Sequence, residues 1–395
     1  MKVAASGVVA LALAGCSFTP GSLRGGSAPQ PQVQQPTVPQ TVDINKEGTK
    51  VALLVPLSAP GETASVGRAL KQAGELAMLD AGDPGIVLIT KDTHGNPQGA
   101  QAAAQAALDE GAQIILGPLL ANEVQAVAPL ARQRNVPVIA FSSSSNVAGS
   151  GTYLMSFLPE QEMASVVSYS ISQGRKNIAA MLPKNQYGAT VERGLVDAVR
   201  QGGGQVVTMV RYAQAPTGII DPIKDVAAAV NDPAKDVQAL VLPEGGEWLR
   251  QIGAGLENAG VTPQRVKVLG TGLWDSNTAR TTPISLGGWY AGVAPEMVSR
   301  FEQRYQSTYG GSALPRVASL AYDAVSLAIT MAKAGGAKPF TSEKITNPEG
   351  YHGVNGLFRF RHDGRIERGL AILEVTPAGP QVIQPAPTRF TGAAF

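Results

Sequence analysis

Residues 112–145 of this 395-residue chain constrain its fold more than any other stretch. They read AQIILGPLLANEVQAVAPLARQRNVPVIAFSSSS: an apolar run, a Gly-Pro turn, an amphipathic helix, a second apolar run and four serines. Short apolar runs on either side of a helical pattern are typical of parallel strands that are buried on both faces. Ligands of such sheets bind beyond the carboxyl ends of the strands, where the serines lie. Hydroxyl and backbone N–H groups there can hold a carboxylate or a hydroxyl without any reaction, so we expect binding rather than catalysis.

The alternation of strand and helix patterns continues along most of the chain. Two further strand–helix units precede the serines, with strands expected at 51–57 and 86–90 and helices at 63–79 and 98–110. This order predicts an α/β fold with doubly wound parallel sheets, and a second, similar series predicts two lobes. In that series we expect strands at 177–183, 205–212, 237–243, 266–270 and 288–293, helices at 160–173, 189–201, 221–230, 247–259, 295–309 and 314–334, and a hairpin-like pair at 357–361 and 369–375.

Composition and motifs exclude several classes of function. The formal net charge is +2, and no Lys/Arg cluster is interleaved with aromatic residues, so we expect no nucleic-acid partner. The three histidines have no metal-ligand spacing, and neither a G-x-S-x-G nucleophile elbow nor a phosphate loop occurs. Gly270-Thr271-Gly272 lacks the third glycine of a dinucleotide fingerprint. We therefore expect no enzyme activity, no cofactor and no metal.

The N-terminus predicts a lipid anchor. Residues 1–16 carry a basic Lys2, an apolar stretch at 8–14 and then Leu13-Ala14-Gly15-Cys16. These four residues resemble the bacterial lipobox, which implies that Cys16 is diacylated and becomes the mature N-terminus. The alternative is a simple cleavable signal with an unrelated cysteine. The residue after Cys16 is Ser17 rather than an aspartate. In lipoproteins of this type, that favours sorting to the outer membrane over the inner one.

Residues 17–48 predict a disordered tether between this anchor and the folded part. Prolines alternate with glutamines and no hydrophobic period survives, so the segment cannot bury enough surface to fold. At ~3.1 Å per residue, about 30 residues in a polyproline-like conformation reach up to roughly 90 Å. The folded part is thus expected to work in the periplasm, away from the membrane that holds its lipid.

The order of the loops resembles a known family. The segments VALLVPLSAPG, DTHGNPQGAQ, ILGPLLANEVQ, VIAFSSSSN, NQYG, LPEGGEWLRQ and NGLFRFRHDGR look like the leucine/isoleucine/valine-binding branch of the type I periplasmic binding proteins. The resemblance covers about residues 49–375. It implies two α/β lobes, a ligand cleft and three hinge crossings, near Phe157, Gly272 and Val354. Lobe 1 is then expected to comprise 49–156 and 273–353 and lobe 2 to comprise 157–272 and 354–377, before a flexible tail at 378–395.

The resemblance implies roles for individual residues in the cleft. In the amino-acid receptors of this family the loop after this strand holds the ligand α-carboxylate, a role that falls on Ser143, Ser144 and Ser145. Ser145 replaces a threonine and keeps the hydroxyl. Tyr187 falls on a second-lobe tyrosine of the Tyr-Gly step that lies over the ligand. The alternatives are a helix N-cap or solvated turn for the serines, and packing at a helix start for Tyr187.

Four positions depart from the family. Gly272 stands where an acid would pair with the ligand ammonium, and Ala121 stands where a hydroxyl often helps to hold the carboxylate. Leu242 replaces an aromatic wall residue, and Ser65 stands near an aromatic residue of the first loop. A buried ammonium without a counter-charge costs several kcal/mol. These departures weaken the expectation of an unmodified branched-chain amino acid as ligand.

Acidic residues close to these positions are candidate replacements for the missing acid. Glu244, Glu247 and Asp275 are the candidates, although each is also explained as an ordinary charge at a helix start. The predicted ligand-binding set is therefore Ser143, Ser144, Ser145, Tyr187, Glu244 and Asp275.

Two functional hypotheses remain, and a third is kept for contrast. The first is a lipid-anchored solute-binding protein that passes an amino-acid-like ligand to an ABC importer permease. The second follows from LLVPLSAPGETASVGRALKQAGELA with ILGPLLANEVQ, which also look like the C-terminal domain of penicillin-binding-protein activators. Those outer-membrane lipoproteins stimulate a peptidoglycan synthase through protein contacts. The third is a hydrolase that uses the serine run.

Overall fold

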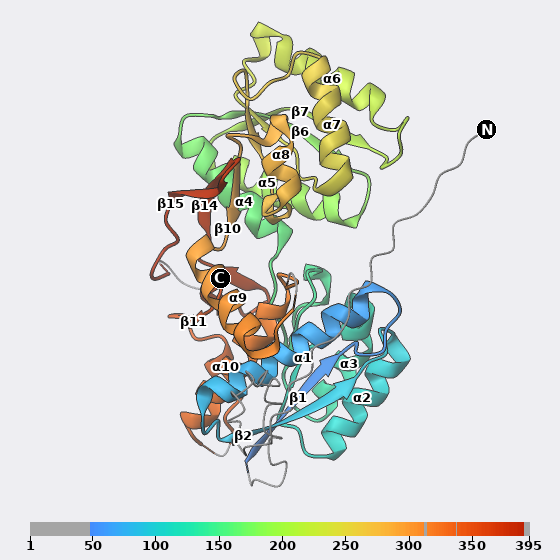
Figure 1. Cartoon of the computed structure of the whole chain (residues 1–395), viewed down its shortest axis with the longest axis vertical. Helices are drawn as coiled ribbons and strands as arrows, with labels where there is room; N and C mark the ends of the chain where they lie inside the picture. Colours follow the sequence, from blue (N-terminus) through green and yellow to red (C-terminus); the bar gives the residue numbers. More distant parts are fainter. Residues whose placement is uncertain (1–47, 312–313, 337, 391–395) are drawn as a thin grey trace, which may run out of the picture. The chain divides into compact units, whose positions relative to one another are not determined.

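The computed structural model describes residues 48–390, except 312–313 and 337. The described chain forms a five-stranded sheet, a seven-stranded sheet and a three-stranded sheet, shown with their helices in Figure 1. We call the five-stranded sheet with the elements packed on it the first lobe, and the seven-stranded sheet with its helices the second lobe. The signal peptide 1–16, Cys16, most of the tether and residues 391–395 lie outside the described residues, so those expectations stay predictions.

The first lobe is built on a fully parallel sheet with the order β2-β1-β3-β4-β5. Residues 51–55 of β1, which lies between β2 and β3, are completely buried, because helices cover both faces of the sheet. This confirms the interpretation of the apolar runs as parallel strands. The elements are β1 (Thr49–Val55), α1 (Glu62–Ala81), β2 (Ile86–Asp92), α2 (Pro97–Asp109), β3 (Ile114–Leu116), α3 (Ala121–Gln133), β4 (Val138–Ala140), the 3-10 turn η1 (Ser145–Val147) and β5 (Thr152–Leu154).

The second lobe is built on a mixed sheet with the order β15-β14-β10-β9-β8-β6-β7. Strands β6 to β10 run parallel, and β14 and β15 are added antiparallel at the β10 edge, where Figure 1 shows them side by side. Its elements are α4 (Pro159–Ser172), β6 (Asn177–Pro183), α5 (Gln186–Gly202), β7 (Gln205–Tyr212), α6 (Ile220–Asn231), η2 (Pro233–Lys235), β8 (Ala239–Val241), α7 (Gly246–Asn258), β9 (Lys267–Leu269), η3 (Gly272–Trp274), α8 (Asn277–Thr281), η4 (Pro283–Ser285), β10 (Trp289–Gly292), β14 (Ala371–Thr376) and β15 (Gly379–Gln384).

The chain returns to the first lobe after β10. Residues Phe301, Leu320 and Phe358 all belong to the apolar core that surrounds the five-stranded sheet. Long helix α10 lies against α1, and a Cβ built at Gly74 of α1 would be 3.3 Å from Val325 of α10. The returning elements are α9 (Pro295–Tyr309), α10 (Ala318–Lys333), α11 (Ser342–Ile345), β11 (Tyr351–Gly353), β12 (Gly356–Phe360) and β13 (Ile366–Arg368).

Two of the expected lobe boundaries are wrong. The boundary expected near Gly272 falls about twenty residues later, because β10 pairs with β9 and so keeps the chain in the second sheet. The boundary expected near Val354 falls close to Leu370, because Phe358, Phe360 and Ile366 pack in the first-lobe core. Periodicity identifies a short strand but does not say which sheet it joins, and this choice depends on contacts that are distant in sequence.

Two expectations for the C-terminal region are also wrong. The hairpin partner of β12 is β13 rather than the strand at 369–375, because a turn in which Arg361 N donates to Arg365 O closes the pair earlier. The segment 378–395 was expected to be a flexible tail, yet β15 pairs with β14 from Thr376 to Ile372. Among the described residues, no helix is long and apolar enough to cross a bilayer.

The packing of α5 on α4 predicts the sign of a stability change. A Cβ at Gly194 of α5 would lie 2.2 Å from the backbone oxygen of Glu160. Gly194→Ala is expected to lower the free energy of unfolding by about 1–3 kcal/mol through overpacking. Helix propensity alone would raise it by roughly 1 kcal/mol. Urea denaturation followed by circular dichroism measures the change, with exposed Gln201→Ala on the same helix as control. A stabilised Gly194→Ala protein would contradict this packing.

Candidate functional site

The four serines follow β4 at the carboxyl edge of the first-lobe sheet. Ser142 and Ser145 are 4% and 5% exposed, Ser143 is exposed and Ser144 is half-buried. The hydroxyl of Ser142 accepts a hydrogen bond from Ser144 N at 3.2 Å, which shapes the turn. Ser145 begins the 3-10 turn η1. The loop thus directs Ser142 inward and leaves Ser143 and Ser144 accessible at the edge where ligands bind in such sheets.

A side chain of the second lobe meets this loop. Arg193 of α5 donates from Nη2 to the hydroxyl of Ser145 at 3.2 Å and to the hydroxyl of Thr190 at 3.2 Å. The serine loop therefore faces a guanidinium, a group that forms charge-assisted hydrogen bonds with carboxylates. Sequence analysis missed Arg193, although its three-residue spacing from Thr190 places the two as neighbours on the surface of the helix.

Tyr187 lies in the first turn of the same helix. Its hydroxyl is hydrogen bonded to Thr271 Oγ1 at 2.7 Å, which links the start of α5 to the end of β9. Burial raises the pKa of the Tyr187 phenol above its ordinary value, and the negative charges of Glu162 and Glu244 add to the effect. The phenol therefore stays protonated and is available as a hydrogen-bonding partner of Thr271.

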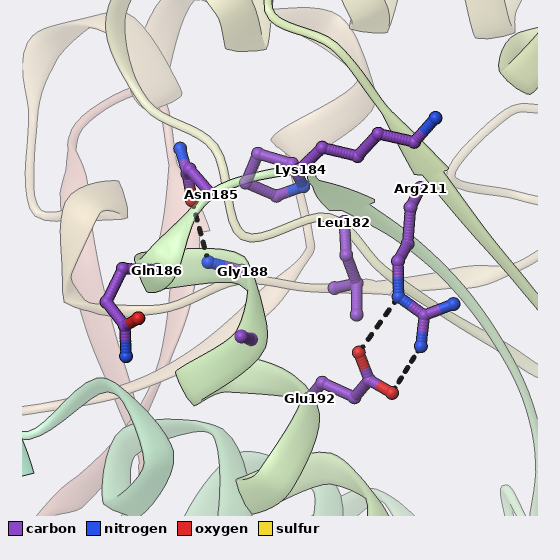
Figure 2. A pocket seen from close by; sticks show the side chains of 9 residues that line it. Leu182, Lys184, Asn185, Gln186, Gly188, Glu192 and Arg211 are labelled. Atoms are coloured by element: carbon purple, nitrogen blue, oxygen red, sulfur yellow. Dashed lines mark hydrogen bonds and ion pairs between the residues drawn. The ribbon is translucent and has the colours of Figure 1, made fainter.

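A small pocket lies beside the start of α5, on the second lobe alone. It has a volume of about 300 Å³ and includes Lys184, Glu192 and Arg211 in its lining. Figure 2 shows the Arg211–Glu192 ion pair and the Asn185 side chain, which accepts from Gly188 N and caps the helix. Tyr187 is not part of this lining. The pocket is therefore distinct from the serine loop.

Glu244 is buried in contacts within its own lobe. Its carboxyl group accepts from the Tyr212 hydroxyl and, at 3.1 Å, from Gln214 Nε2. Its backbone oxygen accepts from Trp274 Nε1 at 2.9 Å. Burial raises the pKa of Glu244 even though the hydrogen bonds from Tyr212 and Gln214 lower it. The carboxyl group is thus held in place, close to Tyr187 but already hydrogen bonded.

Asp275 lies apart from the other predicted residues. It is 3.8 Å from Arg280 and lines a cavity of about 590 Å³ together with Glu302 and Arg316. None of residues 142–145, Tyr187 or Glu244 lines this cavity. The structure therefore does not place Asp275 with the serine loop. The sequence placed it three residues after Gly272, but the turn η3 carries it towards α8 and α9.

Glu162 and Arg316 were not predicted, and both lie at Gly272. Glu162 Oε2 accepts from the Gly272 backbone N at 2.9 Å, and Glu162 Oε1 pairs with Arg316 Nη2 at 3.1 Å. The Arg316 guanidinium also lies 3.8 Å from the centre of the Phe157 ring. Glu162 belongs to the second lobe and Arg316 precedes α10 of the first, so the pair joins the two lobes. The sequence gives no sign of this pairing, because 154 positions separate the two residues.

A Ser–His–Asp cluster occurs at the ends of β1 and β2. Ser58 Oγ lies 2.5 Å and Asp92 Oδ2 lies 3.3 Å from the same nitrogen, Nδ1 of His94. A catalytic triad requires the serine and the carboxylate on different ring nitrogens, so this geometry does not activate Ser58. Partial burial raises the pKa of Asp92, but hydrogen bonds from Ser58 and His94 N outweigh it and lower the pKa overall. Among the described residues there is no group of three or more potential metal ligands.

Comparisons with known proteins agree with this architecture. A family model described as periplasmic binding protein matches residues 48–380. Leu/Ile/Val-binding protein homolog 6 of Brucella abortus is 25% identical over 191 residues, which are 45% of this chain and 48% of that protein. The chain thus spans about half the length of the curated relatives it matches.

Two solved structures share the fold. A putative branched-chain amino acid ABC transporter protein of Rhodospirillum rubrum has a TM-score of 0.73 at 19% identity, over 85% of this chain and all of that one. A solute-binding protein of an ABC transporter of Rhodopseudomonas palustris, in complex with 3,4-dihydroxybenzoic acid, has a TM-score of 0.63 at 21% identity, over 88% and 98% of the two chains. With its two lobes and three crossings, the chain belongs to the type I periplasmic binding proteins.

Proposed function

We propose that this protein is a non-catalytic solute-binding component of an ABC-type importer that closes its two lobes on a small carboxylate. The contact between Ser145 of the first lobe and Arg193 of the second carries the proposal. A carboxylate that enters between these groups accepts from the guanidinium on one side and from the serine hydroxyl and backbone N–H groups on the other. Such a solute bridges the lobes and shifts them towards a closed state.

The amino-acid-like ligand expected from the family resemblance is the starting point for the solute. The Brucella relative is named for leucine, isoleucine and valine binding, and the Rhodopseudomonas structure holds 3,4-dihydroxybenzoic acid. These ligands share a carboxylate and little else. The carboxylate is therefore the group that we assign to Ser143, Ser144, Ser145 and Arg193, with Tyr187 as a wall of the site.

The place of action follows from the sequence expectations. We propose that Cys16 carries the lipid, that residues 17–48 tether the lobes, and that the protein acts in the periplasm, on the outer membrane rather than the inner one. An importer permease is then the partner that receives the solute. Secreted protein isolated from a native host and analysed by intact-mass spectrometry tests the lipid, because an unmodified Cys16 would contradict the anchor.

Isothermal titration tests solute binding. The protein is titrated with amino acids, 2-oxo acids and benzoates. Loss of a hydrogen bond to a charged group costs about 1.5–3 kcal/mol. Ser145→Ala and Arg193→Gln are therefore each expected to weaken binding of the best solute by about 10–100-fold. Exposed Ser168→Ala on α4 serves as control. If none of these compounds produces heat, solute binding is wrong.

The phenol of Tyr187 is expected to contribute to stability and to solute affinity through its hydrogen bond to Thr271. Tyr187→Phe removes this buried hydrogen bond, which is worth about 1 kcal/mol. Urea unfolding should show a loss of that size, and titration should show a few-fold weaker affinity for the best solute. Tyr309→Phe, in the first lobe, is the matched control. An unchanged affinity together with lower stability would assign Tyr187 to packing alone.

The activator hypothesis makes the opposite prediction for the first titration. It expects an unoccupied cleft, and it expects faster glycan polymerisation when the protein is added to a bifunctional peptidoglycan synthase. A protein that binds a solute and leaves the polymerisation rate unchanged supports the importer hypothesis instead.

A further inference from the structure

The cavity of about 590 Å³ that Asp275 lines is bordered by both lobes. Asp275 and Arg280 line it from the second lobe, and Phe301, Glu302 and Arg316 line it from the first. No residue of the serine loop, 142–145, takes part in this lining. The volume falls in the range of small-molecule sites, about 300–1,000 Å³. The cavity is therefore large enough for a ligand of its own, and such a ligand would contact both lobes.

Glu302 is the charged side chain of this cavity that lacks a partner among the described residues. Arg316 pairs with Glu162 at 3.1 Å, and Arg280 lies 3.8 Å from Asp275. The half-buried carboxyl group of Glu302 has no hydrogen bond or ion pair with any residue that the structure describes. The charge that remains unpaired in the cavity is therefore negative.

The carboxyl groups of Glu302 and Asp275 come from different lobes and act on each other. Burial raises the pKa of Glu302, and the negative charge of Asp275 raises it further. The 3.8 Å between Asp275 and Arg280 is too long for a hydrogen bond, so Asp275 keeps oxygen atoms free for a donor. A cation in the cavity relieves this repulsion and can donate charge-assisted hydrogen bonds to the carboxylates.

The rest of the lining favours an organic cation over a metal ion. Ca²⁺ takes about six to eight oxygen ligands, whereas the described residues contain no group of three or more potential metal-binding side chains. Much of the wall is apolar and is formed by Pro295, Val298, Phe301, Leu314 and Val354. An alkyl or aromatic body can pack on such a wall. The two guanidinium groups disfavour a second ammonium on the same molecule.

We propose that this cavity is a second binding site, for an organic amine with one ammonium group and an apolar body. The ammonium binds to Glu302 and Asp275, and the body packs on the apolar wall that includes Phe301. The charge of this ligand is opposite to that of the carboxylate which we assign to the serine loop. The inference does not depend on the proposed function, because Ser145 and Arg193 do not line this cavity.

Three probes with the same body and different charges test the site. Phenethylamine, 2-phenylethanol and 3-phenylpropanoate are titrated separately into the full-length protein by isothermal calorimetry at pH 7. The amine is expected to bind about tenfold or more tightly than the alcohol, because only the amine brings a charged donor to the carboxylates. An amine that gives no heat, or that binds no better than the alcohol, overturns the proposal. Heat with Ca²⁺ but not with the amine overturns it as well.

A variant of Glu302 then locates the bound amine. Glu302→Gln is expected to weaken phenethylamine about tenfold or more and to leave the affinity for the best carboxylate solute unchanged. Glu296→Gln is the matched control, because it removes the same charge from the same helix at an exposed position that does not line the cavity. Urea unfolding of both variants checks that the fold is retained.

The outcomes separate this site from the serine loop. An amine affinity that is the same in Glu302→Gln and in the unchanged protein contradicts the site. Equal losses of amine and carboxylate affinity in Glu302→Gln would indicate a single shared site and also contradict it. If the amine binds and no carboxylate does, the solute proposal is wrong and the amine site stands.

Discussion

The carboxylate of Glu162 is the contact on which the junction of the lobes depends. It accepts from the backbone of Gly272 and pairs with Arg316, so it connects the start of α4, the end of β9 and the segment before α10. The first two segments belong to the second lobe and the third belongs to the first lobe. A buried carboxylate is stable only when its partners are in place. The ion pair therefore fixes the relative position of these segments where the two lobes meet.

Phe157 and Arg368 extend this junction to the third crossing. The Arg368 guanidinium lies 4.7 Å from the centre of the Phe157 ring and donates to Ser156 O at 2.8 Å. Burial lowers the pKa of Arg368 to about 10, which is partly offset by the charge of Asp323. Asp323 in turn accepts from Val354 N and Asn355 Nδ2, both at 2.7 Å. The Phe157 ring thus contacts two guanidinium groups, those of Arg316 and Arg368. Polar contacts of this kind can be exchanged for others during a hinge motion more readily than a packed apolar core can be rearranged.

Local patterns predicted the elements well and their long-range partners poorly. The apolar runs around α3 predicted parallel strands and a serine loop at their carboxyl edge, and both are present because burial on two faces leaves a direct mark in the sequence. The partner of β10 and the placement of β12 depend on contacts between distant segments, which leave no such mark. Asp275 shows the same limit at the site: its distance from Gly272 in sequence is short, but the turn that follows directs it into another cavity.

At Gly272 the sequence indicates only that an acidic residue is missing, whereas the structure shows which side chains take its space. Taken alone, a glycine in place of an acid indicates only that a hydrogen bond and a charge are missing. The structure adds that Arg316 and Glu162 occupy the space, so glycine is the residue that this packing requires. A fold shared with amino-acid receptors therefore does not carry their ligand with it, because the fold is determined by buried strands and helices while the ligand is selected by a few charges at their ends.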